Sequence, residues 1–592
     1  MSFVGGYEVP DNPLVQFLAA YGPVPSAKNM YDEFVVSEAK RLYLQPLCIK
    51  EDLSEQLAAD FHTKDPKTII LTGTAGDGKT YTARRVYELM DGTSTEWNED
   101  RPEIHLKVPE SNRTIVFVRD LSEMSDKEKE SLLPRLKNAI CQQGNELFLV
   151  CVNDGHLLKT WREHLGEQDK SYLALKEMLR EDSETSDSLP ELRLINMSRH
   201  CHAGVASAII DAVTGHPGWD LCPDDCPAKE GSCPILVNRE ILSQDDKASI
   251  RHRLTQLVTL AATDGEHLSI RHLIIIVVNA LLGYSDHSGK QTLLDCHLAK
   301  KFAEAGAYQV TNPFSHVFGD NLPERQRKQY QCFTILSRFG IGDETDNFFD
   351  SALLGLLDRN ELPDHPFYGD RIFNPVRHRY LGGQNPDIDA FRQAIRAQRQ
   401  RLFFMLSDES RPWILTLYHS APRYLDFAAP EDKESNNAKS TFQRVLVKGI
   451  NRALTGALTN STDKLWLIEP SGVLLGKDLP LISVPPLEWD NPFGLSMTLE
   501  APSETGKTPC LYIYGARLEV SATLFEYLDR ICSGALPTSF SNQCLQDILN
   551  FRRQAIGCIH RKKEGTKYLH LVDTNGDQLQ EQPIRIFEAH GF

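Results

Sequence analysis

A glycine-rich stretch between a strand-like and a helix-like segment constrains the fold of this chain more than any other feature. The stretch GTAGDGKT, residues 73–80, matches the pattern G-x-x-x-x-G-K-[ST]. TIIL at 68–71 precedes it and reads as a short buried strand, and TYTARRVYELM at 80–90 reads as a helix. This order predicts an α/β unit in which the glycine turn lies at the carboxyl edge of a sheet.

The residue types in this turn suit a polyphosphate. Glycines let the backbone curl so that its N–H groups point at an anion, Lys79 can reach the β- and γ-phosphates, and Thr80 can offer a hydroxyl to Mg²⁺. The N-terminus of the following helix also favours an anion. A glycine-rich turn matching by chance does not explain the flanking strand and helix. We expect ATP and Mg²⁺, with nucleotide contacts from Gly73, Thr74, Ala75, Gly76, Asp77, Gly78, Lys79, Thr80 and Tyr81. Asp77 is also a candidate cap for the helix.

A second apolar segment, 114–118, leads to an acid that suits a metal ion. Asp120 comes at its carboxyl end, where ligands gather in open α/β sheets. We expect Asp120, with Thr80, to hold the Mg²⁺ shell. Glu123 is a candidate to polarise the attacking water. The alternative for Glu123 is the first turn of the charged helix predicted at 125–140.

A third apolar segment, ELFLVCV at 146–152, ends in an amide and an acid. Asn153 is a candidate to orient the attacking water or to sense the γ-phosphate, since the strand and helix spacing brings it beside Lys79. Asp154 is the alternative metal-associated acid, or a turn residue before a glycine. A fourth strand is predicted at 191–197.

This succession of a strand with a phosphate loop, an acid-ended strand and an Asn-ended strand resembles the AAA+-like branch of P-loop ATPases, over roughly residues 45–290. The resemblance implies an α/β P-loop core, a parallel sheet flanked by helices, followed by a helical lid that carries an arginine near the phosphates. The apolar helix predicted at 266–283 suits such a lid, and Arg271 is its candidate arginine; a surface ion pair is the alternative. The family also borrows an arginine from a neighbouring subunit, and Arg180 and Arg199 are equal candidates.

The arrangement is also similar to large ATPase subunits of bacterial antiphage defence and restriction systems, including the phosphorothioation-dependent type. Such a subunit works beside a separate nuclease or other effector. The resemblance implies an ATP-hydrolysing enzyme that couples nucleotide state to conformational change or oligomer assembly, as a homo-oligomer or with an effector protein. The alternative is a nucleotide-dependent scaffold or sensor with little turnover, favoured because no acid directly follows Asp120. A small-molecule kinase is disfavoured, because the chain is long and shows no compact substrate lid.

Three cysteines, each followed by proline, form a second candidate site. Cys222, Cys226 and Cys233 have the spacing C-x₃-C-x₆-C, compact enough to wrap a tetrahedral structural zinc ion. A fourth ligand is required, and His216, Cys201, His202 and His200 are all candidates within reach in the sequence. Thiols buried without a metal are the alternative, and a catalytic zinc is disfavoured because no general-base glutamate accompanies the cluster.

At 592 residues the chain is too long for one hydrophobic core. A linker-like composition near 430–440 separates a mainly helical region from short strands, and the Asn-Gly pair at 575–576 predicts a hairpin. The predicted domains are an N-terminal extension (1–44), the P-loop core (45–215), a Cys-rich loop and helical lid (216–294), a helical middle domain (295–430) and an α+β C-terminal module (431–592).

The net charge limits the kinds of partner that this protein can bind. The net charge of −17 argues against a uniformly basic surface that coats DNA, although a local basic groove remains compatible with it. Arg392, Arg396 and Arg399 share one face of a predicted helix at 391–404, where they suit a phosphate backbone, an acidic partner or plain solvation. DNA or another nucleic acid is therefore one candidate partner.

No apolar run reaches the length of a membrane span, and the N-terminus lacks a secretory signal pattern. An odd number of cysteines, 13 in all, indicates a reducing environment rather than a disulfide framework. We expect a cytoplasmic protein with no membrane partner.

Overall fold

The contacts of the chain divide it into two compact units. The first comprises residues 1–258, 267–338 and 347–410, and the second comprises 259–266, 339–346 and 411–592. Residues 411–430, predicted to belong to the helical middle domain, thus group with the C-terminal unit. This computed structural model describes residues 11–23, 32–50, 52–97, 101–108, 113–142, 144–200, 203–224, 226, 232–285, 293–356, 362–383, 387–430, 436–456, 462–468, 481–482, 486–492, 495–502, 508–562, 568–575 and 578–585.

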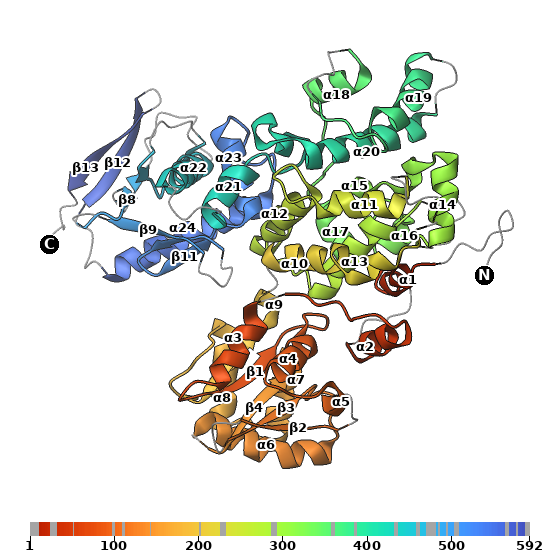
Figure 1. Ribbon diagram of the computed structural model, residues 1–592. Helices are drawn as coiled ribbons and strands as arrows, with labels where there is room; N and C mark the ends of the chain where they lie inside the picture. Colours follow the sequence, from red (N-terminus) through yellow and green to blue (C-terminus); the bar gives the residue numbers. More distant parts are fainter. Residues whose placement is uncertain are drawn as a thin grey trace. The chain divides into compact units, whose positions relative to one another are not determined.

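A five-stranded, mostly parallel sheet forms the core of an α/β part of the first unit (Figure 1). Its order is β2-β3-β4-β1-β5; β2 runs antiparallel to β3, and the remaining pairings are parallel. The four predicted strands are confirmed, whereas the edge strand β2 was not predicted. The strands are β1 (Thr68–Thr72), β2 (Ile104–Lys107), β3 (Thr114–Val118), β4 (Glu146–Cys151) and β5 (Leu192–Asn196).

Helices cover both faces of this sheet, which explains why its central strands are apolar at almost every position. Ile70 and Val150 belong to the core that includes α6, α7 and α8, whereas Ile69 and Leu149 belong to the opposite core, with α3 and α4. Adjacent residues of a strand thus face opposite layers. The helices of this α/β part are α3 (Asp52–Phe61), α4 (Lys79–Leu89), α5 (Ser94–Trp97), α6 (Asp126–Cys141), α7 (Asp154–Leu165), α8 (Lys170–Glu181) and α9 (Met197–His200).

The rest of the first unit is helical. Helix α13 is buried from Leu273 to Leu282, because apolar residues occupy almost every position of IRHLIIIVVNALL. The helices are α1 (Pro13–Ala19), α2 (Asp32–Arg41), α10 (Ala203–Thr214), η2 (Pro217–Leu221), α11 (Pro234–Ser243), α12 (Ile250–Thr263, which ends in the second unit), α13 (Ile270–Leu282), α14 (Cys296–Ala305), η3 (Tyr308–Thr311), α15 (Pro313–His316), α16 (Glu324–Arg327), α17 (Gln331–Ser337), α18 (Asn347–Leu354), α19 (Asp370–Leu381), α20 (Ile388–Met405) and η4 (Asp408–Ser410).

The second unit is of mixed α and β structure. It contains a five-stranded sheet of order β11-β10-β9-β8-β6 and a three-stranded sheet of order β13-β12-β7. The predicted hairpin is confirmed by the antiparallel pairing of β12 with β13, although Gly576 lies outside the described residues. Its elements are η5 (Pro412–Leu415), α21 (Ala421–Ala428), α22 (Asn436–Thr455), β6 (Lys464–Leu465), β7 (Leu481–Ile482), β8 (Leu487–Trp489), β9 (Ser496–Glu500), β10 (Cys510–Ile513), β11 (Ala516–Glu519), α23 (Ala522–Cys532), α24 (Asn542–Lys562), β12 (Tyr568–Asn575) and β13 (Gln578–Arg585).

Within the part of the chain that the structure describes, no helix combines the length and apolar composition that crossing a bilayer requires.

Candidate functional site

The glycine-rich loop between β1 and α4 has backbone angles that side chains rarely adopt. Gly73, Gly76 and Gly78 have φ values of 133°, 96° and 84°. Gly78 is the N-cap of α4 and brings no side-chain cap. The first N–H groups of a helix lack intrahelical partners. This helix terminus therefore presents backbone donors to whatever lies against the loop, which is the arrangement that binds an anion.

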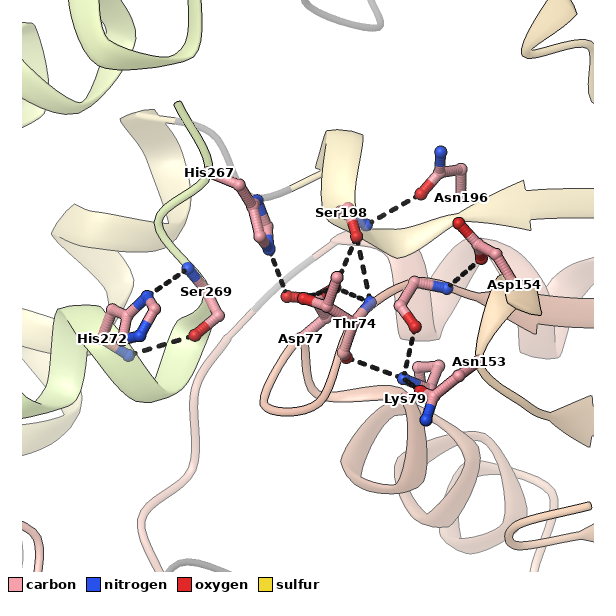
Figure 2. Close-up of polar contacts among 11 residues, drawn as sticks. Thr74, Asp77, Lys79, Asn153, Asp154, Asn196, Ser198, His267, Ser269 and His272 are labelled. Carbon is pink, nitrogen blue, oxygen red and sulfur yellow. Dashed lines mark hydrogen bonds and ion pairs between the residues drawn. The ribbon is translucent and has the colours of Figure 1, made fainter. Parts of the chain in front are cut away.

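Lys79, the first residue of α4, lies at the centre of the site (Figure 2). Its Nζ donates to the carbonyl oxygens of Gly73, at 3.0 Å, and Thr74, at 2.8 Å, and to Oδ1 of Asn153 at 2.8 Å. Burial lowers the pKa of Lys79, and nearby acids, Asp77 and Asp120 among them, partly oppose this shift. A cation held by neutral oxygens at the loop is well positioned to exchange them for the oxygens of a polyphosphate.

Strand order explains why these groups meet. Strand β4 lies between β1 and β3, and all three run parallel. The residues that follow their carboxyl ends, Lys79, Asn153 and Asp120, therefore gather at one edge of the sheet. Thr80 is oriented toward the same edge, where its Oγ1 lies 3.5 Å from the carbonyl oxygen of Arg119. The Oδ1 of Asp120 accepts from the backbone N of Ser122 at 2.7 Å.

The two further acids proposed from the sequence lie elsewhere in this edge. Oδ1 of Asp154 accepts from the backbone N of Gly73 at 2.8 Å, so this carboxylate holds the beginning of the loop. Glu123 is exposed in the turn after β3, where its backbone N bonds the carbonyl oxygen of Asp120 at 3.3 Å.

Asp77 does not cap α4; that prediction was wrong. Its carboxylate is buried and accepts from the backbone N of Thr74 at 2.6 Å and from Oγ of Ser198 at 2.7 Å. It also pairs with Nε2 of His267 at 2.5 Å (Figure 2). Burial acts to raise the pKa of Asp77, but these hydrogen bonds and the charge of His267 hold it below its usual value. The Asp77 carboxylate thus stabilises the conformation of the loop through these three contacts.

Ser198 and His267 were not identified from the sequence. Ser198 follows β5, the fourth parallel strand, and also lies 3.1 Å from the backbone N of Thr74. The position of Ser198, directly after a predicted strand, was the available signal, because residues at that sheet edge share a surface. His267 precedes α13, and no local pattern links it to a loop almost 200 residues earlier.

The beginning of α13 packs against the glycine loop. The backbone N of Arg271 donates to the carbonyl oxygen of Gly76 at 3.2 Å. A Cβ built on Gly76 lies 3.0 Å from Cβ of Arg271, so the loop and the helix approach closely. Arg271 is therefore adjacent to the loop, as its predicted role requires.

Tyr81 faces away from this edge toward the segment that precedes α3. Its hydroxyl accepts from the backbone N of Ile49 at 2.9 Å and bonds the carbonyl oxygen of the same residue at 3.0 Å. These hydrogen bonds hold that segment beside α4. Ala75, another predicted contact residue, is exposed in the loop.

The remaining predicted arginines are the two candidates for a neighbouring subunit's site and the three on α20. Arg180 is exposed and pairs with its neighbour Glu181 at 3.0 Å, and the side chain of Arg199 lies outside the described residues. The stripe on α20 is not a free basic face, because two of its three arginines pair with acidic side chains. Arg396 pairs with Asp320 at 2.6 Å and Arg399 with Asp350 at 2.8 Å. Of the three, Arg392 is the exposed one, 3.7 Å from Asp389.

The predicted zinc ligands are brought together in part. Cys222, Cys226 and Cys233 line one cavity of about 30 Å³, and Cys296 of α14 completes its set of thiols. His216 is not among the lining residues: its Nε2 bonds the carbonyl oxygen of Gln45 at 2.9 Å and its Nδ1 accepts from the backbone N of Gly218 at 3.0 Å. Both ring nitrogens of His216 are thus engaged in hydrogen bonds. The structure therefore contradicts the prediction of His216 as a zinc ligand. Cys201, His202 and the side chain of His200 lie outside the described residues.

Comparison of this chain with models of known protein families, with curated proteins and with solved structures finds no match.

Proposed function

We propose that the first unit binds ATP with Mg²⁺ and hydrolyses it. The observation that carries the proposal is the position of Lys79: its ammonium group lies between two loop carbonyls and Asn153, at the N-terminus of α4. Backbone donors, a buried cation and a nearby carboxylate then share one sheet edge. Few ligands other than a metal-bound polyphosphate use all three.

Each residue of this edge has a proposed role. The amides of residues 76–80 cradle the phosphates, and Lys79 exchanges its carbonyl partners for phosphate oxygens. Thr80 and Asp120 hold the Mg²⁺, Thr80 directly and Asp120 through water. The bound Mg²⁺ neutralises charge on the β- and γ-phosphates. Asn153 orients the attacking water, an arrangement supported by its hydrogen bond to Lys79.

Contacts of the loop support coupling between nucleotide state and the helical part of the first unit. Gly76 bonds the backbone N of Arg271, and Asp77 pairs with His267. A change in the loop on hydrolysis therefore alters the environment of the N-terminus of α13, a helix that is buried from Leu273 to Leu282. We propose that this change drives assembly of the chain with itself or with an effector protein, in a cytoplasmic antiphage defence or DNA restriction system.

Nucleotide binding and turnover by the Lys79→Ala variant test the proposal. Lys79→Ala is expected to weaken ATP binding at least about tenfold, a loss of about 1.4 kcal/mol, and to abolish turnover. Lys64→Ala, an exposed lysine of the same unit, is the matched control and is expected to match wild type. Equal ATP affinity in wild type and Lys79→Ala, with both proteins folded by circular dichroism, contradicts the proposal.

A second candidate, a nucleotide-dependent scaffold with little turnover, is favoured by one observation: Glu123 is exposed in the turn after Asp120. The scaffold predicts ATP binding with negligible hydrolysis, and an unchanged rate in Glu123→Gln. The ATPase predicts Mg²⁺-dependent turnover that Asp120→Asn lowers by on the order of 10²-fold. Steady-state phosphate release from wild type and both variants, with and without duplex DNA, distinguishes the two.

A further inference from the structure

Four cysteines from separate parts of the sequence face one small cavity in the first unit. Cys222 and Cys226 lie in the loop after η2, Cys233 is the N-cap of α11, and Cys296 is the first residue of α14. All four line the cavity of about 30 Å³, and none of them forms a disulfide. A structural core rarely gathers four thiols by packing alone, since each could be any small apolar residue.

Two N–H groups of the buried residue Asn12 donate to two of these sulfurs. The backbone N of Asn12 donates to Sγ of Cys296 at 3.3 Å, and its Nδ2 donates to Sγ of Cys222 at 3.1 Å. Asn12 is 1% exposed and is fixed by its Oδ1, which accepts from the backbone N of Leu14 at 2.8 Å. Sulfur is a poor acceptor as a thiol and a better one as a thiolate. In metal–cysteine sites, nearby N–H groups commonly donate to the thiolate ligands and orient them.

Two helix N-termini also meet at this cavity. Cys233 caps α11, and Cys296 occupies the first turn of α14. The positive end of a helix stabilises a nearby thiolate, as does a metal ion. Two helix N-termini and two N–H groups of Asn12 thus lie against these sulfurs, a setting that complements thiolates bound to a metal ion.

We propose that Cys222, Cys226, Cys233 and Cys296 together bind one structural zinc ion. A set of four thiolates leaves no open coordination position, so the site is structural and not catalytic. Binding exchanges four S–H protons for four Zn–S bonds and releases the protons to solvent. In the part of the chain that the structure describes, no three His, Cys, Asp or Glu side chains lie at coordinating positions, so the proposed site requires these four thiols to move closer together on binding. The bound ion ties the 222–233 loop to α14 and, through Asn12, to α1.

Metal content of the purified full-length chain tests this site. Elemental analysis of protein prepared without chelators is expected to give about one zinc per chain, and Cys296→Ser is expected to lower this at least about fivefold. Cys48→Ser, an exposed cysteine, is the matched control, and His216→Gln is also expected to keep the ion. Retention of zinc by Cys296→Ser overturns the assignment of the fourth ligand. Less than about half an equivalent of zinc in wild type overturns the site, as does stoichiometric iron in its place.

A measurement on wild-type protein keeps the proposal testable if the variant does not fold. Thiol alkylation followed by peptide mass spectrometry is carried out before and after treatment with a strong chelator. We expect Cys222, Cys226, Cys233 and Cys296 to be protected together before treatment and labelled together after it. Labelling of all four at the same rate in both samples contradicts zinc binding. A cobalt-reconstituted sample is expected to show the sulfur-to-cobalt charge-transfer absorption of a four-thiolate site.

Discussion

His267 Nε2 lies 2.5 Å from Oδ1 of Asp77, and this pair joins the glycine-rich loop to the segment that begins α13. The carboxylate is fully enclosed, and hydrogen bonds from the Thr74 backbone and the Ser198 hydroxyl satisfy its other oxygen. The loop is thus held from behind in the shape that leaves Lys79 and the N-terminus of α4 at the sheet edge. A buried carboxylate with this many hydrogen-bond partners holds the loop in one geometry.

Asp77→Asn is expected to loosen the loop. The amide loses the charge that pairs with His267 and introduces an NH₂ group where acceptor oxygens are required, at a cost of about 1–3 kcal/mol. We expect a lower melting temperature and an ATP affinity reduced on the order of tenfold. Differential scanning fluorimetry and nucleotide titration measure both. Asp65→Asn, an exposed site in the same unit, is the control. An unchanged melting temperature and ATP affinity in Asp77→Asn contradict a role of Asp77 in stabilising the loop.

Asn153→Ala is expected to affect turnover more than binding. The amide bonds Lys79 and, in the proposed reaction, orients the water, so its loss removes transition-state positioning. We expect kcat to fall by on the order of 10²-fold while KM changes less than about threefold. The control is Asn145→Ala, an exposed residue at the opposite end of β4. A change in KM alone implies that Asn153 contributes to binding instead.

Gly78→Ala is expected to distort the beginning of α4. Gly78 has a φ of 84°, a conformation that costs an L-residue about 1–2 kcal/mol. The added Cβ also lies 2.6 Å from Cδ1 of Ile270 at the beginning of α13. Thermal melts and ATP titration are expected to show loss of both stability and affinity. Gly155→Ala in α7 provides the matched control: its Cβ meets nothing within 4 Å, and helix propensity makes that change neutral or stabilising.

His316 is expected to make stability fall in mild acid. Complete burial lowers its pKa to about 3. A histidine whose folded pKa is depressed binds its proton in the unfolded chain first, so stability is lost as pH falls below about 6.5. Between pH 7 and pH 5 this contributes a loss of about 2 kcal/mol. Melting curves of wild type and His316→Gln are compared across this range, with the half-exposed His105→Gln as control. Parallel pH profiles for wild type and His316→Gln contradict this contribution.

Local patterns were sufficient for much of the α/β part. The four apolar segments became β1, β3, β4 and β5 because uninterrupted apolar runs bury both faces of a strand. The antiparallel strand β2 escaped detection, because IHLK alternates between buried and exposed positions over only four residues. The helical period of α20 was predicted, but the acids that neutralise its arginines, Asp320 and Asp350, lie far away in sequence.

The strand, the glycine loop and the helix that carries Lys79 follow from local sequence, because they depend on neighbouring residues and on the φ angles that only glycine adopts easily. Which distant side chains contact them depends on how the chain folds. Asn153 lies beside Lys79 because β4 pairs with β1, and His267 reaches Asp77 from far along the chain. Cys296 joins the three clustered cysteines for the same reason. These contacts depend on long-range packing, which cannot be read from the spacing of residues along the chain.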